Sequence, residues 1–303
     1  MHADALADAA SVLLHGVVPR GVWRAEARLL GPTPTQESED DLRDLLLFHQ
    51  DVVQPLSRCF AFALPCGGAL RAIARHAPAA GVVEVGCGTA LWAVLLRRRG
   101  VPVHAYDAWP SPCPYAHVKC AFAASAARPH ADCALFLCWP SLEQELPPES
   151  AVGPRSRAVG LNLMGVNALR AYEGDTLFYV GEWEGRSGLL AMMSPRTQCG
   201  LTAGRTFQEE IRAAWKLVET VPLPRWPGFC DRLYVFRRVA AADSGVETVA
   251  EPPPPPPAEA AAGTSASALG TRLATLRSLG GSGAGRQQAV MAAALLHAEL
   301  ECS

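Results

Sequence analysis

Short apolar runs alternate with segments of helical spacing through the middle of the chain. Strand-like runs occupy residues 82–85, 102–107, 133–139, 176–181, 217–224 and 232–238, and helical patterns occupy residues 68–76, 90–99, 163–172 and 207–215. This alternation is typical of a parallel sheet whose strands are connected by helices. The last two runs are joined by the turn 222–231 alone, which indicates a closing pair of strands. We therefore predict an α/β domain over residues 56–239, with a Rossmann-like sheet and helices on both faces.

The two flanking regions have a different composition. Residues 1–55 are rich in Ala, Leu and charge, and residues 42–48 have a helical pattern, so we predict a helical N-terminal extension. In residues 240–303, six prolines (252–257) precede a stretch rich in Ala, Gly and Ser. This composition predicts a stiff linker followed by a disordered tail. The apolar residues at 288–300 are either a short helix that docks on a protein partner or a frayed end, since isolated helices of this length are marginal in water.

Composition and charge exclude several classes of partner and location. Half of the 303 residues are hydrophobic and the formal net charge is −2, so we expect a buried core and no nucleic-acid partner. No apolar run reaches the roughly 18–20 residues that a membrane helix needs, and no basic segment with an apolar core indicates a secretory signal. The ten cysteines form no CxxC pair. We expect free thiols and a cytoplasmic location.

A glycine turn follows the first predicted strand of the domain. Gly86, Cys87 and Gly88 come directly after residues 82–85, and a predicted helix begins almost at once. Glycines at such a turn allow a ligand to approach the backbone closely. The second strand ends in Asp107, 19 residues after Gly88, where a carboxylate can accept hydrogen bonds from ribose hydroxyls. We therefore predict a site for an adenosine-containing cofactor.

Two cofactor classes share this layout, and the loop sequence favours one of them. A dinucleotide site uses G-x-G-x-x-G, but the third glycine is replaced here by Leu91, which follows Ala90. S-adenosylmethionine has no phosphate to cradle, and its positive sulfonium and ammonium groups favour an acidic neighbour such as Glu84. We predict S-adenosylmethionine as the cofactor. A nucleotide-dependent oxidoreductase and a tight turn without a ligand remain the alternatives.

The sequence from Val82 to Ala108 resembles motif I and the following acidic strand of class I S-adenosylmethionine-dependent methyltransferases. More narrowly, the domain resembles uncharacterised methyltransferase-like proteins with LCWPP, YVGEW and WPGxxDxLYV segments, which read LCWP at 137–140, YVGEW at 179–183 and WPGFCDRLYV at 226–235 here. The resemblance covers roughly residues 58–239. It implies a seven-stranded sheet whose last strand inserts antiparallel, and a cofactor pocket that contains Glu84, Gly86, Cys87, Gly88 and Asp107.

Two positions depart from the pattern of this family. Ala90 stands where a glycine is usual, and we expect its methyl group to crowd the cofactor slightly. Ser141 follows Pro140 where a second proline is expected, in the loop that normally lines the acceptor site. The sequence therefore indicates the cofactor pocket more strongly than it indicates catalysis.

Candidate catalytic residues come from the carboxyl ends of the strands, where ligands bind in open α/β sheets. Trp139 and Pro140 end one strand, and the indole either packs against an acceptor or caps the core. Glu182 ends another, where it either orients or deprotonates an acceptor or forms a surface or salt-bridged carboxylate. Cys138 is a candidate nucleophile, but an inward position on an apolar strand favours packing. The histidines form no cluster along the sequence, so we predict no metal site.

These observations favour a methyltransferase that acts on an unknown small molecule or protein. A catalytically inactive relative that serves as a binding or interaction module is the second hypothesis. Methyl transfer needs donor and acceptor to be held in line, with proton removal added for some acceptors. The absence of an obvious base from the sequence therefore does not decide between the two hypotheses.

Overall fold

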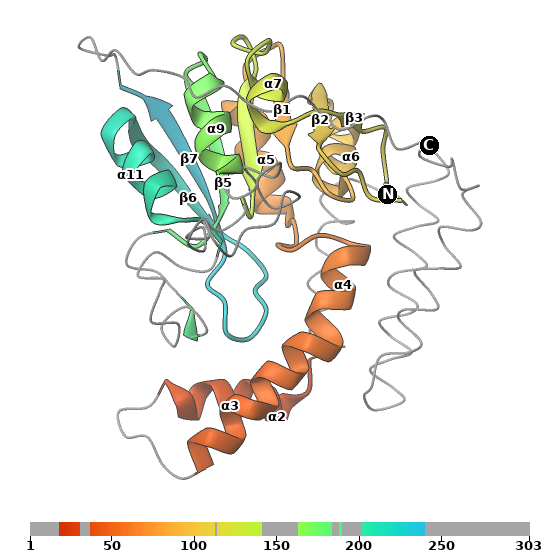
Figure 1. The fold of residues 1–303 in the computed structure, drawn as a ribbon, viewed down its shortest axis with the longest axis vertical. Coiled ribbons are helices and arrows are strands. Elements are labelled where there is room, and N and C mark those ends of the chain that lie inside the picture. Colours follow the sequence, from red (N-terminus) through yellow and green to blue (C-terminus); the bar gives the residue numbers. More distant parts are fainter. Residues whose placement is uncertain are drawn as a thin grey trace, which may run out of the picture.

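A mixed sheet of seven strands forms the centre of the protein (Figure 1). The computed structural model describes residues 18–30, 37–112, 114–140, 163–183, 188–189 and 202–239. The strands lie in the order β3-β2-β1-β4-β5-β7-β6. Their bounds are β1 Val82–Val85, β2 Val103–Asp107, β3 Lys119–Cys120, β4 Ala134–Cys138, β5 Thr176–Gly181, β6 Trp215–Pro222 and β7 Arg232–Arg238.

The directions of the strands confirm the predicted Rossmann-like sheet of the methyltransferase type. Strands β1 to β5 run parallel to one another, whereas β7 pairs antiparallel with both β5 and β6. The β6–β7 pair thus places the last strand between β5 and β6, as the resemblance implies. Since Gly181 pairs with Arg232, the start of β7 lies at the same sheet edge as the carboxyl ends of the parallel strands.

Helices cover both faces of this sheet, as the alternating pattern predicts. Helices α5 (Gly67–His76) and α6 (Leu91–Arg98) pack on one face, whose core includes Val82, Phe136 and Val180. On the other face are α7 (Ala123–Ala127), α9 (Met164–Ala171) and α11 (Arg205–Ala214), with Leu135 and Tyr179 in the core between them and the sheet. Alternate residues of each strand therefore enter two separate cores, as the two-residue period of a strand requires.

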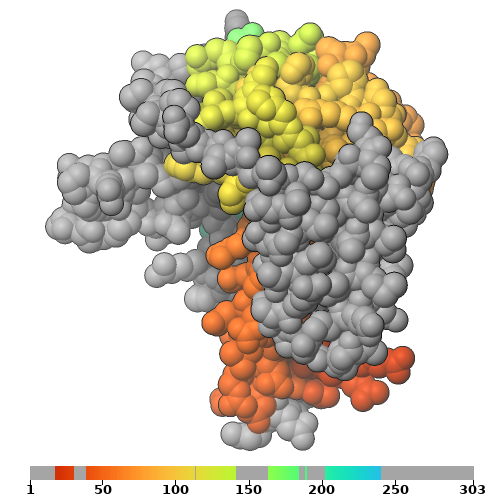
Figure 2. Space-filling model, turned by 90° about the vertical axis from the view of Figure 1, so that its right-hand side faces the viewer, coloured from red at the N-terminus to blue at the C-terminus, as the bar shows by residue number. Residues whose placement is uncertain are grey.

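The N-terminal part is helical and extends away from the α/β domain (Figures 1 and 2). It consists of α2 (Arg20–Leu29), α3 (Glu37–Phe48), the π-helical turn η1 (His49–Val53) and α4 (Gln54–Cys59). The last three follow one another without a break, so the helical run crosses residue 55, where the sequence predicts the domain to begin. Within the described residues, no helix is both long and apolar enough to span a membrane.

The boundaries of several elements differ from the predicted ones because the backbone conformation changes at a residue that the sequence pattern includes in the element. Ala90 and Trp139 have φ angles of +58° and +51°, which exclude them from the helix and the strand in which the sequence places them. Trp215 begins β6 instead of ending the preceding helix, and its buried indole stacks on Tyr172 with ring centroids 6.1 Å apart. The short elements β3 and α7 are absent from the predictions because neither has enough residues to show a period.

Three sequence predictions lie outside the described residues. They are the Pro-rich linker and low-complexity tail at 240–303, the short helix at 288–300 and the loop residue Ser141.

Candidate cofactor and acceptor site

Backbone hydrogen bonds hold the glycine turn against the second strand. The N–H groups of Gly86 and Cys87 both donate to the carbonyl oxygen of Tyr106, at 2.9 and 3.0 Å. Gly86 and Gly88 have φ angles of +74° and +54°, in the left-handed region that favours glycine. The turn therefore ends β1 abruptly and places its backbone at the edge of the sheet.

Open space faces Gly88. Apart from its chain neighbours, no atom of the described residues lies within 4 Å of a Cβ built on this residue, whereas a Cβ on Gly86 would lie 2.7 Å from Cε of Met164. Gly86 is thus packed against the protein, while Gly88 leaves room beside its backbone. Ala90 has a completely buried methyl group that belongs to the core under α6, so the structure places this methyl in packing contacts with the protein.

Asp107 binds the glycine turn directly. Its Oδ2 accepts the N–H of Gly88 at 2.8 Å, and its Oδ1 accepts the N–H of Trp109 at 2.8 Å. Burial raises the pKa of this carboxyl, and the two N–H donors oppose the rise. Because a carboxylate offers about four lone-pair positions, two acceptor positions remain for a ligand.

Glu84 is a buried carboxyl beneath the turn. It is 1% exposed, and its Oε2 has no hydrogen-bond partner among the described residues. Burial raises the pKa of Glu84 to about 8, an effect that Arg97 opposes and Asp107 reinforces. A backbone hydrogen bond with Ala93 also opposes the rise, so one oxygen has a partner and Oε2 has none. A buried carboxyl with one such oxygen gains free energy from a cationic ligand, since burial of a polar atom without a partner is costly.

The two cysteines near Glu84 are held as neutral thiols. Burial raises the pKa of Cys87 and of Cys138 well above the ordinary value of a thiol, and Glu84 adds to both shifts. Since the thiolate is the nucleophile, this environment does not activate Cys138. The packing interpretation of Cys138 is therefore favoured over covalent catalysis.

Trp139 turns out of β4 into an aromatic group. Its ring stacks on Phe62 with centroids 5.4 Å apart and contacts Phe229 at 4.8 Å. Its Nε1 donates to Oδ1 of Asp231 at 2.9 Å, and the next residue, Pro140, is buried. The indole thus joins the end of β4 to the loop before β7.

Asp231 is a candidate functional residue that the sequence predictions did not single out. It is 3% exposed, and its Oδ2 has no hydrogen-bond partner within the described part of the chain. Burial and the nearby Glu182 raise the pKa of Asp231 to about 8, while the Trp139 indole opposes the rise. A carboxyl with a pKa near neutrality fits a general acid or base. The WPGFCD segment, which contributes to the family resemblance, ends in Asp231, but only the fold shows that Asp231 lies beside Trp139.

Glu182 holds backbone groups together. The side chain is fully buried, and its Oε1 accepts the N–H groups of Gly188 and Cys230 at 2.7 and 2.9 Å. These bonds fix the segment that leads to Asp231. The structure therefore gives Glu182 a positioning task, which differs from the surface or salt-bridged carboxylate weighed from the sequence. A catalytic role for Glu182 stays a prediction.

The N-terminal helices brace the loop that carries Asp231. Glu26 of α2 is buried and forms an ion pair with Arg225 at 2.6 Å, and it accepts the N–H of Gly228 at 2.8 Å. His49 of η1 bonds to the carbonyl oxygen of Pro227 and packs edge-on against Phe229. The extension thus contacts the same loop that contributes to the aromatic group around Trp139.

The histidines form no cluster along the sequence, but the fold brings two of them together. His104 and His130 lie together with Cys133, although 26 residues separate the two histidines in the sequence. Strand β1 pairs with both β2 and β4 and so brings the two histidines together. The spacing of the histidines along the sequence does not indicate this pairing. They lie away from the glycine turn.

Comparisons with known proteins identify no close relative. No protein-family model matches the sequence, and a comparison with curated proteins finds no similar sequence. Solved structures match at low identity.

Three of these structures illustrate the likeness. A tRNA (uracil-54, C5)-methyltransferase of Pyrococcus abyssi in complex with S-adenosyl-L-homocysteine is 12% identical, with a TM-score of 0.29, over 59% of this chain and 40% of its own. A glycopeptide N-methyltransferase complexed with S-adenosyl-L-homocysteine is 10% identical, with a TM-score of 0.34, over 69% of this chain and 100% of its own. A protein of the NADB-Rossmann superfamily from Streptococcus agalactiae is 13% identical, with a TM-score of 0.33, over 79% and 99%. TM-scores this low carry no argument about the reaction, and the fold assignment rests on the order and direction of the seven strands.

Proposed function

We propose that this protein is an S-adenosylmethionine-dependent methyltransferase that acts on a small molecule or a protein. The observation that carries the proposal is the exposed glycine turn at Gly88, to which Asp107 bonds directly and before which the buried Glu84 keeps one oxygen without a partner among the described residues. S-adenosylmethionine supplies an activated methyl group on a positive sulfonium, so the protein has to bind, orient and shield its reaction partners.

The residues of the turn fit this cofactor. Asp107 retains acceptor positions for ribose hydroxyls, and the Gly88 backbone is accessible to a ligand. The carboxyl of Glu84, whose pKa is raised to about 8, would ionise beside an ammonium or sulfonium group, because a nearby cation stabilises the carboxylate. The pyrophosphate of a dinucleotide would instead keep this carboxyl protonated, so no charge pairing with Glu84 favours NAD.

Asp231 and Trp139 are the groups we assign to the acceptor. Both lie at the carboxyl edge of the sheet, and Asp231 has a free oxygen for an acceptor proton. The stacked rings of Phe62 and Trp139 offer a flat apolar surface beside it. In its ionised form, which becomes the main form above a pH of about 8, Asp231 would accept a proton from an oxygen or nitrogen acceptor.

One observation favours the second candidate function, a binding protein without catalysis. The Trp139 indole already occupies Oδ1 of Asp231, and Phe62 covers one side of the indole. The chain itself thus fills part of the position that an acceptor would take.

Calorimetric titration of the full chain with S-adenosylmethionine, S-adenosylhomocysteine and NAD tests the proposal. We expect the first two to bind and NAD not to bind. Selective binding of NAD, or no binding of any of the three, contradicts the proposal.

Labelled methyl donor separates the two candidates once binding is shown. The full chain is incubated with this donor and with small-molecule and protein fractions of a cell extract. A labelled product that is lost in Asp107→Asn supports methyl transfer. Binding without any labelled product supports the non-catalytic candidate.

A further inference from the structure

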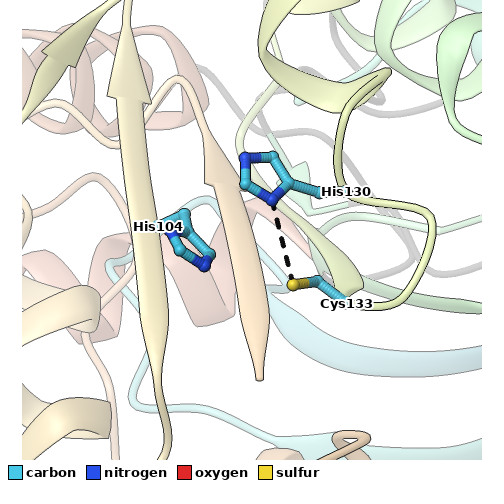
Figure 3. A group of neighbouring side chains, drawn as sticks. All are labelled: His104, His130 and Cys133. Atoms are coloured by element: carbon cyan, nitrogen blue, oxygen red, sulfur yellow. Dashed lines mark hydrogen bonds between the residues drawn. The ribbon is translucent and has the colours of Figure 1, made fainter. Parts of the chain in front are cut away.

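His104, His130 and Cys133 form a group of potential metal ligands at the amino-terminal edge of the sheet (Figure 3). His104 is the second residue of β2, and the other two lie in the connection between α7 and β4. One donor atom from each residue lies within 4.8 Å of the other two. The cofactor turn lies at the opposite ends of the same strands, so this group is separate from the proposed cofactor site.

The donor atoms are close to the spacing of a tetrahedral metal site. Nδ1 of His130 lies 4.0 Å from Sγ of Cys133, and the rings of His104 and His130 stack with centroids 4.5 Å apart. Metal bonds of about 2.0–2.1 Å to nitrogen and 2.3 Å to sulfur place tetrahedral ligands roughly 3.3–3.8 Å apart. Because an imidazole binds a metal through a lone pair in its ring plane, the stacked rings of His104 and His130 have to rotate relative to one another to share one ion with Cys133.

The second nitrogen of His130 already has a partner. Its Nε2 lies 2.9 Å from the hydroxyl oxygen of Tyr106, and this contact leaves Nδ1 on the side of Cys133. Histidine ligands of metals characteristically donate the other ring N–H to such an acceptor, which fixes the orientation of the ring. Tyr106 thus holds His130 as a metal site requires.

Burial and charge around the group are compatible with a cation. Cys133 is buried, and His104 and His130 are half-buried, so one side remains open to water. Asp132 supplies negative charge nearby, while Lys119 lies over the Tyr106 ring, 5.7 Å from its centroid, and opposes it.

We propose that His104, His130 and Cys133 bind a divalent transition-metal ion of the zinc class, with water in the fourth position. Two imidazoles and one thiolate select Zn²⁺ and Co²⁺ over Mg²⁺ and Ca²⁺, which prefer oxygen ligands. The ion ties β2 to the connection before β4. Since His104 precedes Asp107 by three residues on β2, the ion braces the strand that holds the glycine turn and takes no part in methyl transfer.

Titration of the metal-free full chain with Co²⁺ tests this site, because Co²⁺ reports its ligands by absorption. We expect one ion per chain, with a thiolate-to-cobalt absorption band that Zn²⁺ abolishes by displacement. Cys133→Ser should remove the band, and His104→Gln should weaken binding at least about tenfold. Zn²⁺ should raise the melting temperature of the wild-type protein by more than that of either variant at the same metal concentration.

Control variants and a folding check separate a loss of metal binding from a loss of folding. Cys120→Ser changes an exposed cysteine of the neighbouring strand and His117→Gln changes an exposed histidine, and both should bind Co²⁺ as the wild type does. Circular dichroism checks that the Cys133 variant is folded, and the half-buried His104 position supplies a second, milder change. A wild-type protein without the thiolate band, or unchanged affinity in folded His104→Gln, overturns the proposal.

Discussion

Buried carboxyl groups distinguish the carboxyl edge of this sheet at the residue scale. Glu84 and Asp231 each keep one oxygen without a hydrogen-bond partner among the described residues, and each has a pKa raised to about 8. Such groups reduce the stability of the empty protein. They are functional candidates for that reason, since natural proteins retain unfavourable groups mainly at sites of function.

The stability of the protein should fall as pH rises from about 5 to about 8 and level off above that range. In this window the folded state holds protons on Glu84 and Asp231 that the unfolded chain has lost, so each group contributes a slope of up to about 1.4 kcal/mol per pH unit. Glu84→Gln and Asp231→Asn should each make the slope shallower. Urea unfolding at several pH values measures it, with the exposed Glu209→Gln as control. Stability that rises over this range contradicts the burial of neutral carboxyls.

Asp107→Asn should weaken the binding of S-adenosylhomocysteine by roughly 1–3 kcal/mol, because it removes charge-assisted hydrogen bonds. Asparagine preserves the size of the side chain that binds the N–H of Gly88 and Trp109. Calorimetric titration measures the change, and Asp51→Asn at an exposed position is the control. Equal affinities of the wild type and Asp107→Asn would mean that the ribose lies elsewhere.

At the scale of elements, the N-terminal helices and the β6–β7 loop act as one unit. Glu26 of α2 and His49 of η1 both contact the segment between Pro224 and Asp231. The ion pair between the buried Glu26 and the partly exposed Arg225 joins residues that are 199 positions apart in the sequence. Such a contact gives the extension a physical role in positioning Asp231.

Glu26→Gln should destabilise the protein by about 1–3 kcal/mol, because the buried carboxylate bonds to a charged group and a backbone N–H. Asp40→Asn is the matched control, since Asp40 pairs with Arg43 on the exposed surface and such pairs contribute about 0–1 kcal/mol. Urea unfolding compares the two variants. A cost for Glu26→Gln no larger than that for Asp40→Asn would show that the extension does not brace the loop.

Element types could be predicted from the sequence where the period was long enough. The strand at Thr176–Gly181 is predicted with its exact bounds, because six buried apolar or small residues follow one another there. The predicted secondary structure of Trp215 and Trp139 is wrong for a different reason, since tertiary contacts decide the backbone conformation of both residues. Asp231 and the pairing of His104 with His130 depend on which strands become neighbours, which no local pattern contains.

At the scale of the whole molecule, the sheet carries different chemistry at its two edges. The carboxyl edge joins the glycine turn to Asp107, Trp139 and Asp231, and the amino edge holds the His104, His130 and Cys133 group. Strand β2 connects them, with His104 near one end and Asp107 at the other. The proposed ion and the proposed cofactor therefore stabilise the same strand from opposite ends.

The affinity of Gly88→Ala for S-adenosylhomocysteine tests the central claim most directly. Ala90 already adopts φ +58° in the same turn, and among the described residues only the chain neighbours of Gly88 can lie within 4 Å of a Cβ there. The substitution should therefore leave the chain folded at a cost of about 1–2 kcal/mol. If the space beside Gly88 belongs to the cofactor, the new methyl group should raise the dissociation constant at least about tenfold. Calorimetric titration of wild type and variant, with thermal unfolding to verify the fold, supplies the comparison. A folded Gly88→Ala variant that binds as tightly as the wild type would contradict the account.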